Sequence, residues 1–180
     1  ACIFAKQNHI FDMGIDDINI NLSPVQCCYE ELAQDLIRIA GEYDIPMSRM
    51  HLEITESGIM DKEEIRETLE TLRSSGAKIA LDDFGTGYSS LNHIREIPID
   101  VLKVDQSFVK DLAGDAYSQS FIKMVAELAQ TIGVSICVEG IETPEQFKVL
   151  QGMKVKYIQG YYFAKPMPKK DYVKLLQKNR

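Results

Sequence analysis

Residues 78–87 read Lys-Ile-Ala-Leu-Asp-Asp-Phe-Gly-Thr-Gly, an apolar run that ends in two acidic residues and a glycine-rich stretch. Such a short and almost entirely apolar run is typical of a strand buried on both faces of a parallel sheet. Outward from it, runs of the same kind recur, each followed by a polar turn and a helical pattern. The predicted strands are Ile18–Asn21, His51–Thr55, Lys78–Asp82, Val101–Val104, Val134–Val138 and Tyr157–Gln159.

The segments between these runs carry helix signals. Ile65, Leu69 and Leu72 are spaced to form one apolar helical face that ends before Gly76. Thr143-Pro144-Glu145-Gln146 predicts a helix start, with a capping residue, a proline at the first helical position and a glutamine three after the cap. A longer helix is expected to have an apolar stripe formed by Phe121, Val125, Leu128 and Ile132.

This alternation predicts one α/β domain over residues 1–180, which fits either a doubly wound open sheet or a barrel. A complete (β/α)₈ barrel has eight strands, and six are recognised here.

Composition narrows the functional classes. The 180-residue chain has a formal net charge of −7 and no apolar run near 18 residues, which argues against DNA binding and membrane insertion. Its N-terminal residues lack a signal-peptide pattern, and its four cysteines form no CxxC pair, so reduced thiols in the cytoplasm are expected. An anionic substrate would need a positive group in the site, which makes bound metal ions a reasonable expectation.

Polar side chains fall at the ends of all six predicted strands. In a barrel these ends meet on one face, where barrel active sites lie, whereas an open sheet would spread them along an edge. Their convergence therefore favours the barrel. The strand-end residues are Asn21, Glu53, Glu56, Asp82, Asp83, Lys103, Asp105, Glu139, Glu142 and Gln159.

Carboxylate and amide oxygens without histidine or thiolate suit hard cations such as Mg²⁺, Mn²⁺ or Ca²⁺. The adjacent pair Asp82-Asp83 could serve two metal ions, a recurring device for phosphodiester hydrolysis. Lys103 could orient a water molecule or stabilise charge, and Glu139 could act as the base. The simpler alternative for each acidic residue alone is a helix cap or a solvated group, notably for Asp83 and Glu142.

For two further segments, the sequence allows both a functional and a purely structural interpretation. The stretch 82–91 is either a flexible loop over a site or an ordinary helix-entry turn. Tyr161, Tyr162 and Phe163 either stack on a base or pack beside the last strand.

From about Ile18 to Pro168, the sequence resembles the EAL-domain family of bacterial cyclic di-GMP phosphodiesterases. Six ordered motifs carry the resemblance: Asn21-Leu22-Ser23-Pro24-Val25-Gln26, Glu53-Ile54-Thr55-Glu56-Ser57, the stretch 82–91, Leu102-Lys103-Val104-Asp105, Glu139-Gly140-Ile141-Glu142 and Gln159-Gly160-Tyr161.

The resemblance implies a modified (β/α)₈ barrel that hydrolyses cyclic di-GMP to linear pGpG with one or two Mg²⁺ or Mn²⁺ ions. It implies that Asn21, Glu53 and Asp82 bind one metal, and that Asp83 and Asp105 serve mainly the second. Lys103 and Glu139 would handle the attacking water, and Gln159 would lie in the active site. Glu56 would anchor the loop that contains Phe84, Gly85, Thr86 and Gly87, which the family uses for substrate binding and dimerisation.

The Glu-Ala-Leu motif that names the family is absent, as is the first strand pair that carries it. We therefore expect a domain truncated at its N-terminus, with one metal ligand fewer and little or no activity, from a parent that an upstream region could anchor to a membrane. An open barrel also exposes strand edges, which predicts a homodimer or a strand-edge-paired oligomer. The competing hypotheses are a non-catalytic cyclic di-GMP receptor and a structural interaction module.

Overall fold

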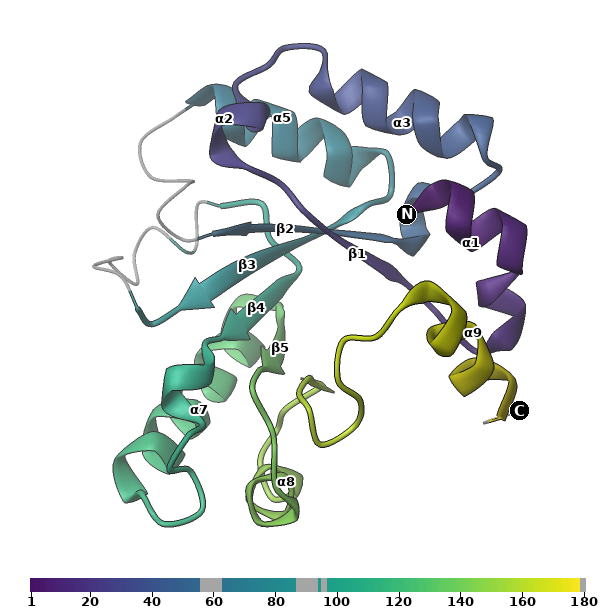
Figure 1. Cartoon of the computed structure of the whole chain (residues 1–180). Helices are drawn as coiled ribbons and strands as arrows, with labels where there is room; N and C mark the ends of the chain where they lie inside the picture. The colour runs from purple at the N-terminus through teal and green to yellow at the C-terminus, as the bar shows by residue number, and fades with distance from the viewer. Residues whose placement is uncertain (56–62, 87–93, 95–96, 179–180) are drawn as a thin grey trace. The chain divides into compact units, whose positions relative to one another are not determined.

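The computed structural model describes residues 1–55, 63–86, 94 and 97–178 (Figure 1). The chain forms two compact units. The first comprises Ala1–Glu53, Asp61–Ile79 and Pro166–Arg180, and the second comprises Ile54–Met60 and Ala80–Lys165. None of the helices in the described ranges has the length and apolarity that a bilayer crossing requires.

The first unit holds the N-terminal strands with their helices. Its elements are α1 (Cys2–Asn8), η1 (Ile10–Met13), β1 (Ile18–Asn21), α2 (Pro24–Cys27), α3 (Leu32–Glu42), η2 (Met47–Arg49), most of β2 (Met50–Thr55), α5 (Glu63–Ser74) and α9 (Lys169–Lys178). β1 and β2 pair in parallel. Helices α3 and α5 contact each other (Figure 1), and Ile65, Leu69 and Leu72 of α5 are fully buried, as the sequence pattern predicts.

The second unit holds most of β3 (Lys78–Phe84) and the rest of the strands. Its other elements are β4 (Val101–Val104), η3 (Gln106–Phe108), α7 (Ala116–Ile132), β5 (Ser135–Val138), α8 (Pro144–Gln151) and β6 (Tyr157–Ile158). The pairs β3–β4, β4–β5 and β5–β6 are parallel. Helix α8 begins with the predicted capping box, in which Thr143 and Gln146 bond reciprocally.

The strand order of the sheet is β1-β2-β3-β4-β5-β6. A doubly wound sheet reverses its order at a switch point, whereas a barrel keeps the order of the chain. The sequential order therefore decides between the two folds that the sequence pattern leaves open, in favour of the barrel type.

The buried face of α7 differs from the predicted stripe. Its buried side chains are Ser118, Ile122, Val125, Ala126 and Ala129, so only Val125 is shared with the prediction. Phe121 instead stacks on Phe108, with the ring centroids 4.0 Å apart. Phe121, Leu128 and Ile132 are half-buried, so the predicted stripe lies partly within the packed side of the helix.

Candidate active site

The consecutive carboxylates of Asp82 and Asp83 lie at a β-bulge in β3. Leu81 pairs with Leu102 and Phe84 with Val104, so two residues of β3 oppose one residue of β4. Asp83 has a left-handed backbone with φ of 57°, a conformation that Asp tolerates better than most residues, and its N–H donates to Oδ1 of Asp82 at 3.0 Å. Because a bulge redirects side chains, it breaks the alternation that would send adjacent residues to opposite faces.

Lys103 is a buried basic residue of the second unit. Its side chain is 4% exposed, and its Nζ lies 3.0 Å from Oδ1 of Asp82 and 2.8 Å from Oε1 of Glu139. A buried ammonium is costly unless it is paired and hydrogen-bonded. The two carboxylates, each 16% exposed in its side chain, offset that cost and fix the ammonium between β3 and the end of β5.

Strand periodicity explains why these groups meet. Val101 and Lys103 share one face of β4, and Cys137 and Glu139 follow the same face at the end of β5, because residues two apart point the same way. One layer of that face is apolar: Ala80, Val101 and Cys137 form a buried cluster against which Tyr157 packs. The next residues on the same faces are Asp82, Lys103, Glu139 and Gln159. The sequence therefore builds an apolar layer with a polar layer at the carboxyl ends of the strands.

A cavity of about 240 Å³ opens beside this polar layer in the second unit. Asp105 is held at its rim because its Oδ1 accepts a hydrogen bond from the N–H of Ser107 at 2.9 Å. Glu142 and Gln159 are exposed and also face the cavity. Among the described residues, the cavity is lined by Asp83, Asp105, Gln106, Glu139, Gly140, Glu142, Gln159, Gly160 and Tyr161.

Asn21 and Glu53 belong to the first unit. They are register partners at the ends of β1 and β2, and the N–H of Leu22 donates to the carbonyl of Glu53 at 2.7 Å. Glu53 is buried, with 7% exposure, whereas Asn21 is exposed. Register partners on parallel strands present their side chains to the same face, so the amide and the carboxylate lie side by side.

The predicted loop is described only in part. Phe84 is a buried residue of β3. Gly85 has φ of 98°, and a Cβ there would meet the ring of Phe108, so only glycine fits. Thr86 closes a turn by donating from its N–H and Oγ1 to the carbonyl of Asp83, at 3.2 and 2.9 Å. Glu56 and Gly87 lie outside the described residues.

The residues after Gln159 separate into two groups. Tyr161 lines the cavity. Tyr162 stacks on Phe147 with the ring centroids 5.4 Å apart, and Phe163 meets Phe147 edge-on at 5.8 Å. The packing interpretation therefore holds for Tyr162 and Phe163, and Tyr161 is the aromatic residue at the candidate site.

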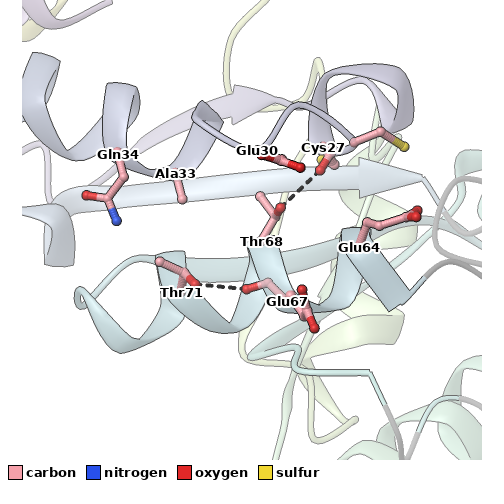
Figure 2. A pocket seen from close by; sticks show the side chains of 9 residues that line it. Cys27, Glu30, Ala33, Gln34, Glu64, Glu67, Thr68 and Thr71 are labelled. Atoms are coloured by element: carbon pink, nitrogen blue, oxygen red, sulfur yellow. Dashed lines mark hydrogen bonds between the residues drawn. The ribbon is translucent and has the colours of Figure 1, made fainter.

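A larger cavity, of about 470 Å³, lies among the helices of the first unit (Figure 2). Glu30, Glu64 and Glu67 line it, and the described part of its lining includes no lysine or arginine. Figure 2 shows Thr68 donating to the carbonyl of Cys27, at 3.0 Å. Because the described residues of its lining include no strand residue and none of the predicted site residues, we assign the candidate site to the smaller cavity.

The donor chemistry of the smaller cavity fits a hard divalent cation, because Asp83, Asp105, Glu139 and Glu142 present only oxygen ligands. Across the described ranges, three or more His, Cys, Asp or Glu side chains do not come together in a group suited to a metal ion. The acidic residues therefore share a cavity without forming a tight ligand cluster, and the Lys103 ammonium lies between two carboxylates.

Sequence reasoning assigned no role to Gln106, Gly140 and Gly160, which line the cavity. The two glycines each directly follow a polar strand-end residue, and this position in the sequence could have indicated that they lie at the site. A Cβ on Gly140 would meet the side chain of Gln106, and one on Gly160 would meet the backbone of Ile141. Nothing in the sequence indicates that Gln106 lines the cavity, because its position there depends on the tertiary contact with Gly140.

Parallel strands in chain order, with a lysine and carboxylates at their carboxyl ends, define a barrel-type α/β protein with an acidic strand-end site. The family model for the EAL domain matches residues 2–166. The chain therefore belongs to the EAL-domain family.

Comparisons with single proteins agree with this assignment. Cyclic di-GMP phosphodiesterase RocR of Pseudomonas aeruginosa is 36% identical over 158 residues, which cover 87% of this chain and 40% of RocR. The chain thus spans about two fifths of that relative's length. The crystal structure of the EAL domain of Mycobacterium smegmatis DcpA matches with a TM-score of 0.92 and 34% identity, over 100% of this chain and 82% of that one.

A third match is the Klebsiella pneumoniae BlrP1 complex with manganese and cyclic di-GMP. Its TM-score is 0.85 at 27% identity, over 93% of this chain and 43% of BlrP1. EAL domains are TIM-barrel-like, so these likenesses confirm the predicted fold class, with six parallel strands in this chain. They also show a divalent cation and the nucleotide together in a structural relative.

Proposed function

We propose that this chain carries the hydrolytic site of a cyclic di-GMP phosphodiesterase, which cuts the cyclic dinucleotide to linear pGpG with Mg²⁺ or Mn²⁺. The observation that carries the proposal is the buried Lys103 ammonium between Asp82 and Glu139, beside a strand-end cavity with further carboxylates. Support comes from the name of RocR and from the nucleotide and manganese in the BlrP1 complex.

The site residues then have distinct roles. Glu139 accepts a proton from the attacking water, and Lys103 holds that carboxylate in place from 2.8 Å. Gln159 and Tyr161 contact the nucleotide at the cavity wall, and Glu142 borders it. When bound, one or two Mg²⁺ or Mn²⁺ ions would supply Lewis-acid polarisation of the phosphodiester. The residues proposed to hold them are Asn21, Glu53, Asp82, Asp83 and Asp105.

We also propose a role for the segment that follows β3. Glu56 anchors the segment that contains Phe84, Gly85, Thr86 and Gly87, and this segment contributes to substrate binding. The tight fit of Gly85 against Phe108 supports a fixed starting point for that segment.

The test compares the 180-residue chain with a form extended at its N-terminus to supply the Glu-Ala-Leu motif. Each is incubated with cyclic di-GMP and Mn²⁺, or with EDTA, and pGpG is quantified by chromatography. We expect turnover by the extended form that stops in EDTA, and little or no turnover by the 180-residue chain. Glu139→Gln should lower kcat by about 10²–10⁴-fold, whereas Glu127→Gln, a change on the exposed side of α7, should not.

Nucleotide binding without pGpG formation in the extended form would replace the hydrolase proposal with the receptor hypothesis. Self-association and a cytoplasmic location stay predictions, and sedimentation velocity measures the first.

A further inference from the structure

Gln146, at the start of α8, is a buried side chain that uses its whole hydrogen-bonding capacity. It is 6% exposed. Its Nε2 donates to the carbonyls of Val109 and Lys110 at 2.9 and 3.3 Å. Its Oε1 accepts from the N–H groups of Glu142 and Thr143 at 2.8 and 3.0 Å. A side-chain amide offers two N–H donors and two acceptor lone pairs, so each is satisfied.

These four bonds join two strand-end loops. Val109 and Lys110 follow β4 and Asp105, whereas Glu142 and Thr143 follow β5 and Glu139. The two loops also touch at the cavity wall, where the space for a Cβ on Gly140 is filled by Gln106. Residues of both loops line the candidate site. Gln146 therefore ties together the two segments that carry Asp105 and Glu139.

Helix capping explains only part of this arrangement. The capping box needs the bond from Thr143 N–H to Gln146 and the bond from Gln146 N–H to Oγ1 of Thr143, at 3.3 Å. The bonds to the carbonyls of Val109 and Lys110, which are 37 and 36 residues away in sequence, add nothing to a helix start. They attach the helix start to the neighbouring loop.

We propose that Gln146 is a positioning residue, which fixes the loops after β4 and β5 relative to each other and thereby sets the placement of Glu139 and Asp105 across the cavity. Its effect on the reaction rests on the proposed function, but its effect on the loops does not. A misplacement of about 1 Å at a reacting group can lower the rate about 100-fold, so loss of this tie should reduce kcat far more than KM.

The experiment pairs Gln146→Met with Thr143→Ala. The first variant keeps the length of the side chain and removes its four hydrogen bonds. The second removes the cap hydroxyl and leaves the Gln146 amide in place, so it controls for a weakened helix start. Hydrogen exchange is measured by NMR on the 180-residue chain at the amides of Glu142 and Thr143 and over residues 105–111. In the extended form, kcat and KM for cyclic di-GMP are measured separately.

In Gln146→Met we expect at least about tenfold faster exchange at both amides and through residues 105–111, and a kcat about 100-fold lower with KM within about threefold. Thr143→Ala should leave exchange at residues 105–111 and kcat within about twofold. Unchanged exchange over 105–111 in Gln146→Met would overturn the proposal, and so would equal kcat losses in the two variants. If the extended form does not hydrolyse the nucleotide, the proposed function fails, while the exchange data still decide whether Gln146 ties the loops.

Discussion

The two units each place one basic side chain between two carboxylates, and the two clusters differ chiefly in burial. In α3 of the first unit, Arg38 lies 2.9 Å from Asp35 and 2.7 Å from Glu42, and these side chains are 59%, 45% and 53% exposed. In the second unit, Lys103 makes contacts of 3.0 and 2.8 Å while its side chain is 4% exposed. The distances between the basic nitrogen atoms and the carboxylate oxygen atoms are therefore similar in the two clusters.

Burial makes the two clusters unequal in energy. When two exposed charged side chains form an ion pair, each gives up contacts with water for the contact with its partner, and most such pairs contribute little to stability. A buried ammonium has given up its hydration, so its carboxylates are needed to keep it charged, and removing one partner leaves an uncompensated charge. The exposed cluster lies on the surface of α3, whereas the buried cluster determines where Asp82 and Glu139 can lie.

The largest effect expected from this comparison is that of Lys103→Met. The change leaves two largely buried carboxylates without their cation, and breaking such an arrangement costs about 3–5 kcal/mol. Urea unfolding at neutral pH measures the loss. Hydrolysis by the extended form should also fall to background, because the ammonium no longer holds Glu139. Lys123→Met, an exposed change on α7, is the matched control, and an equal small loss in both variants would contradict the role of burial.

A second pair of like groups, Cys27 and Cys28, sharpens the comparison. Burial, and to a lesser degree negative charge on the neighbouring Cys28, raises the pKa of Cys27 from 9.0 to about 11, while Cys28 is exposed. The folded state therefore keeps a proton that the unfolded state loses above pH 9. The stability that this difference in proton binding gives the folded state is fully present below pH 9 and is lost as the pH rises to about 11.

The measurement is the free energy of unfolding between pH 8.5 and 11 for the wild type, Cys27→Ala and Cys28→Ala. We expect the decline with pH to be shallower in Cys27→Ala than in Cys28→Ala, whatever the loss of packing does to the absolute values. Iodoacetamide at pH 8 should alkylate Cys28 well before Cys27, because the thiolate is the reactive form. Parallel pH curves for the two variants would contradict the assignment.

Much of the fold was predictable because buried parallel strands have a strong local signal. Ile18–Asn21 and Val101–Val104 match their predicted bounds, and the other four strands differ by one or two residues at their ends. The predicted stripe on α7 was confirmed only in part, because Val125 is buried whereas Phe121, Leu128 and Ile132 are half-buried. Tertiary packing centres the fully buried face on Ile122, Ala126 and Ala129.

The candidate site was predictable in composition and less so in geometry. Strand-end position identified Asp82, Lys103 and Glu139, because the carboxyl ends of parallel strands share one edge. The bulge at Asp82-Asp83 had no local signal, since it depends on the register with β4. The tie made by Gln146 was visible only as a helix cap, because its bonds to Val109 and Lys110 join residues far apart in sequence.

The smallest effect is expected for Arg38→Met, which removes the cation of the exposed cluster. The neighbouring carboxylates of Asp35 and Glu42 raise the pKa of Arg38 through hydrogen bonds and charge, yet all three side chains stay in contact with water. The urea midpoint should therefore match the wild type within error at 0.1 M NaCl, and raising the salt to about 1 M should not separate the two proteins, because salt at that level screens exposed pairs. If Arg38→Met instead destabilised the chain as much as Lys103→Met, contact distance and not burial would set the strength of these clusters, and burial would no longer explain why Lys103 fixes Asp82 and Glu139.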